Sequence, residues 1–277
     1  MGETLSTLRM RPLVATGVLV LGTIVVLAVA APLIAPHDPG ALAITNRLKP
    51  PGGDWWFGTD EFGRDIFSRT LHAGRLSLLV GAGVVLISGI IGILLGILAG
   101  FFPRLDTIVA RFIDALMAFP DILLAVALVA ALGPSLFTVL VALGVVYAPR
   151  LARVVRASTL IIRELPYVEA ARALGVPTWR IIVRHVLRNL ASPILVQCTF
   201  IFAYAILAEA GLSFLGLGVN PEIPTWGTMI AGGRYYAGQA DWMTVFPGLA
   251  IILAALSLQM VGDGLRDLLD PRLGRDL

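Results

Sequence analysis

The sequence of 277 residues is poor in charge and in the residue types that build metal centres or disulfide frameworks. Charged residues make up 14% of the chain, whereas a soluble domain has roughly 25%. The single cysteine, Cys198, excludes a disulfide framework and a cysteine-based metal cluster within the chain. Three histidines, His37, His72 and His185, lie far apart in sequence, so no histidine-rich metal site is expected. The low charge and the hydrophobic share of 57% place the chain in a lipid bilayer.

Lysine is rarer still, since Lys49 is the only one. A nucleotide-binding P-loop needs Gly-x-x-x-x-Gly-Lys-Ser/Thr, because backbone amides hold the phosphates and the lysine reaches the β and γ oxygens. Lys49 stands between Leu48 and Pro50, so this pattern is absent. We therefore expect this chain to bind no cofactor: any ATP and Mg²⁺ that drive its work must bind to partner subunits. No Ser/His/Asp set, carboxylate pair or metal-ligand set occurs at workable spacing, so no catalytic or metal-binding residue is predicted.

Long apolar runs are what the sequence has in abundance. A membrane-spanning helix needs about 20 predominantly apolar residues. Six segments meet or nearly meet this length: Leu13–Ala35, Ser77–Phe101, Arg111–Leu132, Ser135–Val154, Pro193–Leu217 and Met243–Gly264. We predict an all-α, polytopic membrane protein with six transmembrane helices.

The basic residues indicate the orientation, because Lys and Arg accumulate on the cytoplasmic side of a membrane protein. With the N-terminus inside, most arginines lie in the cytoplasm: Arg9, Arg11, Arg104, Arg111, the eight of the segment 150–188, and Arg266, Arg272 and Arg275. The basic residues left outside are Arg47, Lys49, Arg64, Arg69, Arg75 and Arg234. This asymmetry predicts that both termini are cytoplasmic.

The first span has a second interpretation, because Ala28-Val29-Ala30 fits the cleavage site of a secretory signal peptide. The apolar region of a signal peptide is typically about 7–15 residues long. Since this run is longer, we expect an uncleaved anchor.

Residues 36–76 form the longest segment on the outer side. The run Pro50-Pro51-Gly52-Gly53 predicts an irregular backbone in its first half. Phe62, Ile66 and Leu71 recur at helical spacing, so we predict an amphipathic helix from Phe62 to Leu76. This helix either lies in the membrane interface and leads into the second span, or forms part of a lid that receives a substrate.

The polar, Arg-rich segment at about 157–191 has the features of a docking element. Glu169, Ala170, Ala171 and Leu174 are helix formers, and Gly175 permits a left-handed stop at the helix end. Small side chains at positions 170 and 171 allow a partner's groove to approach closely, and Glu169 can pair with a basic group there. We therefore predict a short helix that another protein grips.

A second amphipathic helix is predicted after Pro177. Its expected apolar stripe consists of Trp179, Ile182, Val183, Val186 and Leu190, and its basic face of Arg180, Arg184 and Arg188. Such a helix either belongs to the same docking element or lies on anionic lipid headgroups.

Two carboxylates fall at membrane depth. Asp121 follows Phe119 and Pro120 inside the third span, and Glu209 lies inside the fifth. A charge at the centre of a transmembrane helix costs about 2.5–3.5 kcal/mol on insertion scales, so such residues usually face a cavity or a partner. Asp121 and Glu209 either line a translocation pathway or have structural roles, such as pairing or capping near a kink at Pro120.

Gly92, Gly96 and Gly100 form two overlapping Gly-xxx-Gly units in the second span. Small residues let transmembrane helices approach closely, because packing drives helix association in lipid. These glycines predict a helix-packing face, and the sequence leaves the partner helix open.

The stretch Tyr167–Gly175, with Glu169-Ala170-Ala171 followed by Gly175, resembles the EAA motif of ABC-importer permeases. Two further stretches, Phe57–Arg69 and Glu209–Gly218, look like the dipeptide/oligopeptide/nickel branch of that family and, within it, the "C" permease. The resemblance extends to the tail and covers about residues 10–272, through Pro224–Met229, Gly262–Asp267 and Asp270–Arg272. It departs at Arg188, where many relatives carry a proline before the asparagine.

The resemblance implies the type I ABC importer transmembrane fold and a division of the chain into three parts. These are an N-terminal segment (1–76), a permease domain (77–265) that contains the coupling loop, and a tail (266–277). It implies an ATPase-coupling role for Tyr167, Glu169, Ala170, Ala171, Leu174, Gly175, Arg180 and Arg184. The implied partners are a homologous B-type permease, two ATP-binding subunits, an extracytoplasmic substrate-binding protein and membrane lipid, with no nucleic acid.

The function that the resemblance implies is ATP-driven import of dipeptides or oligopeptides across the bacterial inner membrane, without covalent chemistry in this chain. Import of glutathione or nickel is the alternative within the family. A secondary transporter that uses Asp121 or Glu209 as an ion relay would predict inverted repeats, and the sequence shows none that is convincing. An intramembrane enzyme would need a catalytic set that the sequence lacks.

Overall fold

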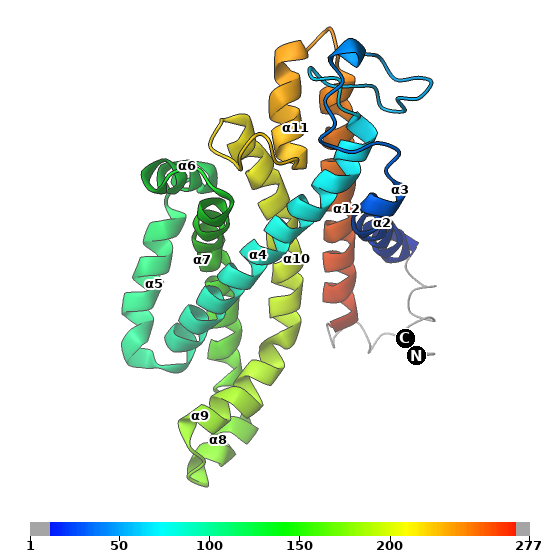
Figure 1. The fold of residues 1–277 in the computed structure, drawn as a ribbon. Coiled ribbons are helices and arrows are strands. Elements are labelled where there is room, and N and C mark those ends of the chain that lie inside the picture. The colour runs from blue at the N-terminus through cyan, green and yellow to red at the C-terminus, as the bar shows by residue number, and fades with distance from the viewer. Residues whose placement is uncertain (1–11, 270–277) are drawn as a thin grey trace.

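Long helices run between two ends of the molecule in the computed structural model, which describes residues 12–269 (Figure 1). The segment 36–65 and one short helix lie at one end, and two short helices form a tip at the other. Several residues used above lie outside the described range, among them Arg9, Arg11, Arg272, Arg275, the Asp270–Arg272 stretch and most of the tail.

The helices, in chain order, are α2 (Pro12–Val29), α3 (Ala31–Ile34), α4 (Ile66–Phe101), α5 (Pro103–Met117), α6 (Asp121–Leu132), α7 (Leu136–Ile162), α8 (Pro166–Ala173), α9 (Thr178–Ile181), α10 (Arg188–Phe214), α11 (Trp226–Gly233) and α12 (Trp242–Leu269). A π-helical stretch, η2 (Ile182–Leu187), joins α9 to α10, and single 3₁₀ turns form η1 (Ile44–Asn46) and η3 (Arg234–Tyr236). Residues 12–269 contain no strand, only two isolated β-bridges in the segment 36–65. The prediction of an all-α protein is confirmed.

Five helical segments of the described chain are long and apolar enough to cross a membrane, and α5 with α6 makes a sixth if the pair counts as one span. The predicted third span, Arg111–Leu132, consists of parts of two helices that meet near the kink expected at Pro120. The chain bends by 89° between α5 and α6. Pro120 accounts for the break, because it has no N–H to donate and disfavours helical backbone at Phe119.

The amphipathic helix predicted from Phe62 to Leu76 was also misplaced. The helix begins at Ile66 and continues without interruption to Phe101 as α4, which has 36 residues. Its start is set by Asp65, whose carboxylate accepts a hydrogen bond from the backbone N–H of Ser68 at 2.9 Å. Phe62 lies before this cap, in a turn.

The second loop helix and the fifth span, predicted as separate, form one continuous helix from Thr178 to Phe214. The π-helical stretch inserts extra backbone into one turn and so rotates the helix face. As a result the buried positions are Ile181, Val186 and Leu190, whereas Trp179 is 63% exposed. The predicted apolar stripe was therefore wrong at Trp179 and at Val183, which is 57% exposed.

The glycines of α4 lie against α7, which identifies the partner helix that the sequence left open. A Cβ atom at Gly92 would lie 2.8 Å from the carbonyl oxygen of Ala148, and one at Gly96 would lie 2.7 Å from that of Ala152. At Gly100 the nearest atom would be Cβ of Thr159, at 2.6 Å. No side chain fits between the two backbones, so the absence of Cβ atoms sets the helix spacing.

Candidate functional site

The tip of the molecule opposite α11 is built by α8 and α9 (Figure 1). α8 begins with Pro166, which has no N–H and suits a first turn whose N–H groups have no helical partner. It ends at Ala173, and two residues later Gly175, with φ of +73°, has the left-handed conformation predicted there. The N–H of Val176 donates to the oxygen of Ala171 at 3.0 Å, and that of Gly175 donates to Arg172 at 2.9 Å. This pair of bonds is a Schellman motif, which fixes the turn into α9.

The tip exposes apolar and charged side chains together. Leu174 is 83% exposed, and Trp179 beyond the turn is also largely exposed. We call the exposed set the α8 surface; it consists of Tyr167, Glu169, Ala170, Leu174, Gly175, Trp179, Arg180 and Arg184. Ala171, predicted to belong to this set, is buried with Val168 against the hydrophobic core.

Specific contacts attach the α8 surface to the long helices. The amide of Asn189, in the first turn of α10, donates a hydrogen bond to the Tyr167 hydroxyl at 3.2 Å. The guanidinium of Arg172 lies 5.1 Å from the ring centre of Phe101, at the end of α4. These contacts and the buried Val168 make the tip an extension of the helix bundle. The contacts join α8 to the end of α4 and to the start of α10.

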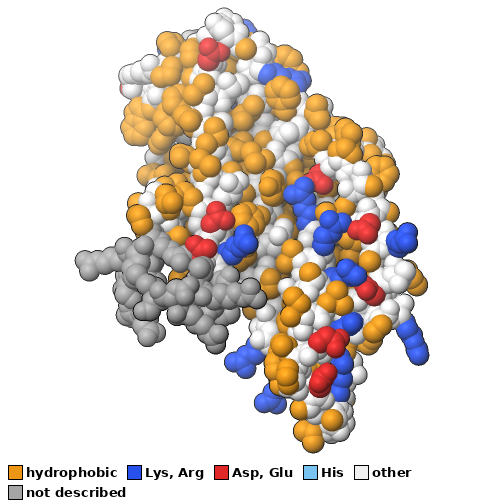
Figure 2. Space-filling model, turned by 180° about the vertical axis from the view of Figure 1, so that it is seen from behind, with side chains coloured by type: hydrophobic (Ala, Val, Ile, Leu, Met, Phe, Trp, Pro, Cys, Tyr) orange, Lys and Arg blue, Asp and Glu red, His pale blue; other side chains and the backbone are white. Residues whose placement is uncertain are grey.

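Charged side chains follow α7 away from the tip. Figure 2 shows Arg and acidic side chains gathered on the half of the surface that ends in the tip, while apolar side chains cover most of the rest of this face. Three ion pairs join α5 and α6 to α7 in antiparallel order. They are Asp106–Arg156, with 2.5 Å between Oδ1 and Nε, Asp114–Arg153, with 2.8 Å between Oδ1 and Nη2, and Asp121–Arg150.

Asp121 is the first residue of α6, directly after the bend, and pairs with Arg150 of α7. The Arg150 guanidinium lies 5.1 Å from the ring centre of Tyr204 on α10 and 5.5 Å from that of Tyr147 on α7. The side chains of Asp121 and Arg150 are 32% and 34% exposed. The structure thus gathers residues from three helices around one half-exposed ion pair.

Glu209 is 1% exposed and is hydrogen-bonded to the N-cap residue of a neighbouring helix. Its Oε1 atom accepts hydrogen bonds from the hydroxyls of Ser213 at 2.8 Å and of Thr225 at 2.9 Å. Thr225 is the N-cap of α11 and forms a reciprocal capping box with Thr228. The carboxylate therefore joins α10 to the start of α11 and faces no open route in this conformation. A pathway role for Glu209 would require this junction to open.

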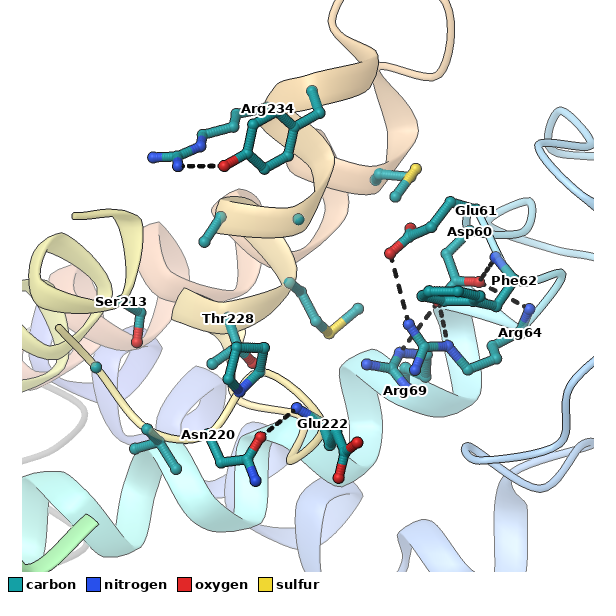
Figure 3. Close-up of a pocket in the computed structure, with 18 of the residues that line it drawn as sticks. Asp60, Glu61, Phe62, Arg64, Arg69, Ser213, Asn220, Glu222, Thr228 and Arg234 are labelled. Atoms are coloured by element: carbon teal, nitrogen blue, oxygen red, sulfur yellow. Dashed lines mark hydrogen bonds and ion pairs between the residues drawn. The ribbon is translucent and has the colours of Figure 1, made fainter. Parts of the chain in front are cut away.

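A cavity of about 650 Å³ lies at the α11 end beside this junction, since Ser213 and Thr228 are among the residues that line it. Its walls come from the segment 60–69, the connection 216–222 and helix α11. Figure 3 shows Asp60, Glu61, Arg64 and Arg69 on one side of it, and Asn220, Glu222 and Thr228 from the other two elements.

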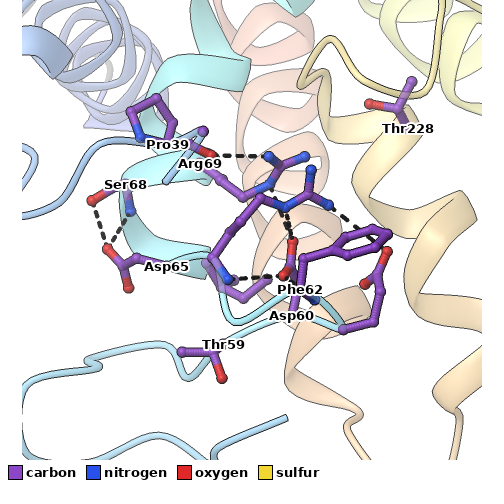
Figure 4. A network of polar contacts seen from close by, with 12 residues as sticks. Pro39, Thr59, Asp60, Phe62, Asp65, Ser68, Arg69 and Thr228 are labelled. Carbon is purple, nitrogen blue, oxygen red and sulfur yellow. Dashed lines mark hydrogen bonds and ion pairs between the residues drawn. The ribbon is translucent and has the colours of Figure 1, made fainter. Parts of the chain in front are cut away.

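Asp60 organises the wall that comes from the segment 60–69 (Figure 4). Its Oδ1 atom accepts the backbone N–H groups of Phe62 and Arg64, each at 2.9 Å. Its Oδ2 atom lies 2.6 Å from Nε of Arg64 and 3.7 Å from Nε of Arg69. Arg69 also donates a hydrogen bond to the carbonyl oxygen of Pro39 at 3.0 Å, which attaches the irregular first half of the segment 36–65 to the start of α4.

The sequence matches two family models. One describes the inner membrane component of binding-protein-dependent transport systems and matches residues 92–275. The chain belongs to this family of permeases. The other describes the N-terminal transmembrane domain of oligopeptide transport permease C and matches residues 1–51 of this permease.

Individual relatives match the permease over most of its length. A peptide transport system permease protein of Brucella suis is 51% identical over 257 residues, which cover 93% of this chain and 87% of the relative. A D,D-dipeptide transport system permease protein of Escherichia coli K12 is 42% identical over 268 residues, or 96% of this chain and 90% of the relative. A chain of the MetNI methionine ABC transporter, solved in inward-facing conformations, superposes with a TM-score of 0.59 at 20% identity and covers 74% of this chain and 98% of that chain. The type I ABC importer fold is therefore confirmed.

The structure separates the predicted site residues of this permease into two regions. The coupling-loop residues gather at the tip, with Ala171 facing inward, whereas Asp121 and Glu209 lie within the bundle and do not contact each other. Sequence reasoning missed the ion pairs between α5 and α7 and the cavity at the α11 end. The arginines at every third position of α7, from Arg150 to Arg156, were a signal for the ion pairs. The cavity had no local signal, because three separate segments enclose it.

Proposed function

We propose that this permease imports short peptides as the C-type membrane subunit of an ATP-driven transporter in the bacterial inner membrane. The observation that carries the proposal is the α8 surface: an exposed apolar and charged tip, rigidly joined to the long helices, in a member of this family. Relatives that transport peptides match the chain over nearly its whole length. Glutathione and nickel complexes stay the alternative cargo for the same assembly.

In the proposed assembly the α8 end lies in the cytoplasm, as do both termini, and the α11 end faces outward. The abundance of Arg in the segment 150–188 supports this orientation. Two ATP-binding subunits hold ATP and Mg²⁺; one docks on the α8 surface, and the other docks on a homologous B-type permease. A substrate-binding protein delivers its ligand at the α11 end. This chain itself carries out no covalent chemistry.

The continuous helix from Thr178 to Phe214 provides a physical route for coupling. Movement of an ATPase displaces α8, and the contact between Tyr167 and Asn189 passes the displacement to the start of α10. At the other end of α10, Glu209 is bonded to the N-cap of α11, which forms a wall of the outer cavity. Closure of the ATPases at one end therefore changes the cavity at the other.

The test is co-purification and uptake with the whole transporter expressed from its own genes. Leu174→Ala removes the most exposed apolar side chain of the α8 surface, and we expect it to lower both the recovery of ATP-binding subunits and the uptake of radiolabelled dialanine. Leu33→Ala is the matched control, since Leu33 is 91% exposed on α3, away from the tip. Uptake that continues without ATP and follows a proton gradient would instead identify a secondary transporter.

A further inference from the structure

The ion pair between Asp121 and Arg150 lies at the start of α6 but far from both ends of α7. Arg150 is 14 residues from the start of α7 and 12 residues from its end. At a rise of 1.5 Å per residue, the guanidinium is attached roughly 20 Å from either end of the helix. Charged side chains on a membrane-spanning helix usually face a partner, the interior of a bundle or a water-filled space.

The ion pair has an open side. About a third of each side chain is exposed. Tyr204, over whose ring the guanidinium lies, is 42% exposed, whereas Tyr147 behind it is 5% exposed. The half-exposed groups thus form one face that carries a cation, an anion and an aromatic ring.

This face complements a zwitterion. A free peptide carries a carboxylate and an ammonium group at its two ends, whatever its side chains are. Arg150 can exchange the carboxylate of Asp121 for that of a peptide, and planar guanidinium–carboxylate pairs are strong because both hydrogen bonds form together. The carboxylate of Asp121, thereby released, can accept the peptide ammonium group, and the ring of Tyr204 attracts cations as well.

We propose that Asp121, Arg150 and Tyr204 form a binding site on the translocation route for the two charged ends of a peptide. The inference rests on the proposed function and adds the substrate groups that the route recognises. The bend between α5 and α6 places the Asp121 carboxylate beside α7. Because the site binds main-chain charges, it accepts peptides of different side chains that a binding protein delivers.

The first test compares peptides with free and blocked ends, using the complete transporter in proteoliposomes with saturating binding protein. The substrates are dialanine, dialanine amide and N-acetyl-dialanine. We expect Arg150→Gln to lower the uptake ratio of dialanine to dialanine amide about tenfold, the factor that about 1.4 kcal/mol of lost binding produces. Asp121→Asn is expected to lower the ratio of dialanine to N-acetyl-dialanine in the same way. Since the binding protein is the same throughout, its own preference cancels in these ratios.

The matched controls are Arg156→Gln and Asp106→Asn. This control pair joins α5 to α7 and lies nearer the tip. Its side chains are similarly exposed, at 31% for Arg156 and 27% for Asp106. Both controls are expected to leave the two ratios unchanged. If Arg150→Gln and Asp121→Asn lower the uptake of all three substrates by one common factor, the pair is structural and the inference is wrong. If the unaltered transporter takes up no dialanine with ATP, the proposed function itself fails.

A second measurement does not depend on the binding protein. In a Cys198→Ala background, Tyr204→Cys and Leu19→Cys are labelled in the purified complex with a cationic methanethiosulfonate. Leu19 is 71% exposed near the middle of α2 and serves as the lipid-facing control. We expect Cys at position 204 to react at least about tenfold faster, and millimolar dialanine to slow it. Equally slow labelling at both positions would place Tyr204 in lipid or against another chain and would overturn the inference.

Discussion

The junction of α10 and α11 offers the sharpest test of the structure, through Gly227→Ala. The added Cβ atom would lie 2.7 Å from Cα of Ala210 and 2.9 Å from Oε2 of Glu209. Carbon atoms pack best about 3.5–4.0 Å apart. The methyl group therefore forces α11 away from α10 by about 1 Å.

Two costs follow from this displacement. Overpacking in a well-packed region costs about 1–3 kcal/mol. The hydrogen bond from Thr225 to Glu209, now 2.9 Å long, would also stretch, and an intramolecular hydrogen bond contributes about 0.5–1.5 kcal/mol net. Since this bond is weakened rather than lost, we expect a destabilisation of about 3 kcal/mol in total.

The assay is the apparent melting temperature of the purified transporter at a fixed heating rate, together with dialanine uptake. For a chain of this size about 3 kcal/mol corresponds to a fall of roughly 6–12 °C. We expect uptake to fall as well, while the ATP-binding subunits still co-purify, because the α8 surface is untouched.

The matched control is Gly248→Ala in α12, where an added Cβ atom meets nothing within 4 Å. This change should be neutral or slightly stabilising, because alanine favours a helix over glycine by about 1 kcal/mol. If the Gly227→Ala transporter has the same melting temperature as the control and takes up dialanine normally, the tight contact between α10 and α11 is refuted.

Two further changes test the packing of α4 and the end of α8. Gly96→Ala should lower the melting temperature of the complex, because its Cβ atom would lie 2.7 Å from a backbone oxygen of α7. Gly89→Ala is the control and should not lower it, since a Cβ atom there meets nothing within 4 Å. Equal melting temperatures of the two variants would contradict the close approach of α4 and α7. Gly175→Ala places a side chain at φ +73°, which costs roughly 1–2 kcal/mol, so we expect weaker co-purification of the ATP-binding subunits. Gly175→Asn should partly restore it, because asparagine tolerates this conformation better. If Gly175→Ala leaves the recovery of those subunits unchanged, the turn is not part of the contact.

Local features of the coupling loop could be read from the sequence because they depend on neighbouring residues. The stop at Gly175 follows from the freedom of glycine to adopt positive φ, and the structure confirms it. The break in the third span at Pro120 had a visible cause as well, although its size did not follow from the sequence. A proline shows where a helix is interrupted, whereas the 89° angle depends on what α6 packs against.

Features that join distant segments were not predictable in this way. The π-helical stretch rotated the buried face of the second loop helix, and no residue pattern indicated it. The junction between Glu209 and Thr225 and the wall around Asp60 depend on which helices meet, which one sequence does not specify. The same holds for the pairing of Asp121 with Arg150, since 28 residues separate them along the chain.

The sequence by itself determined that this chain is a helical membrane protein, that the P-loop pattern is absent from it, and that a short arginine-rich element interrupts the spans. These conclusions follow from composition and short-range periodicity, which act within a few residues. Only the tertiary structure decided that α4 lies backbone to backbone against α7 and that a cavity opens at the α11 end. It also decided that Glu209 accepts a hydrogen bond from the N-cap residue of α11, while Asp121 pairs with an arginine in the middle of α7. Those outcomes depend on contacts between helices, and such contacts exist only after the helices have packed.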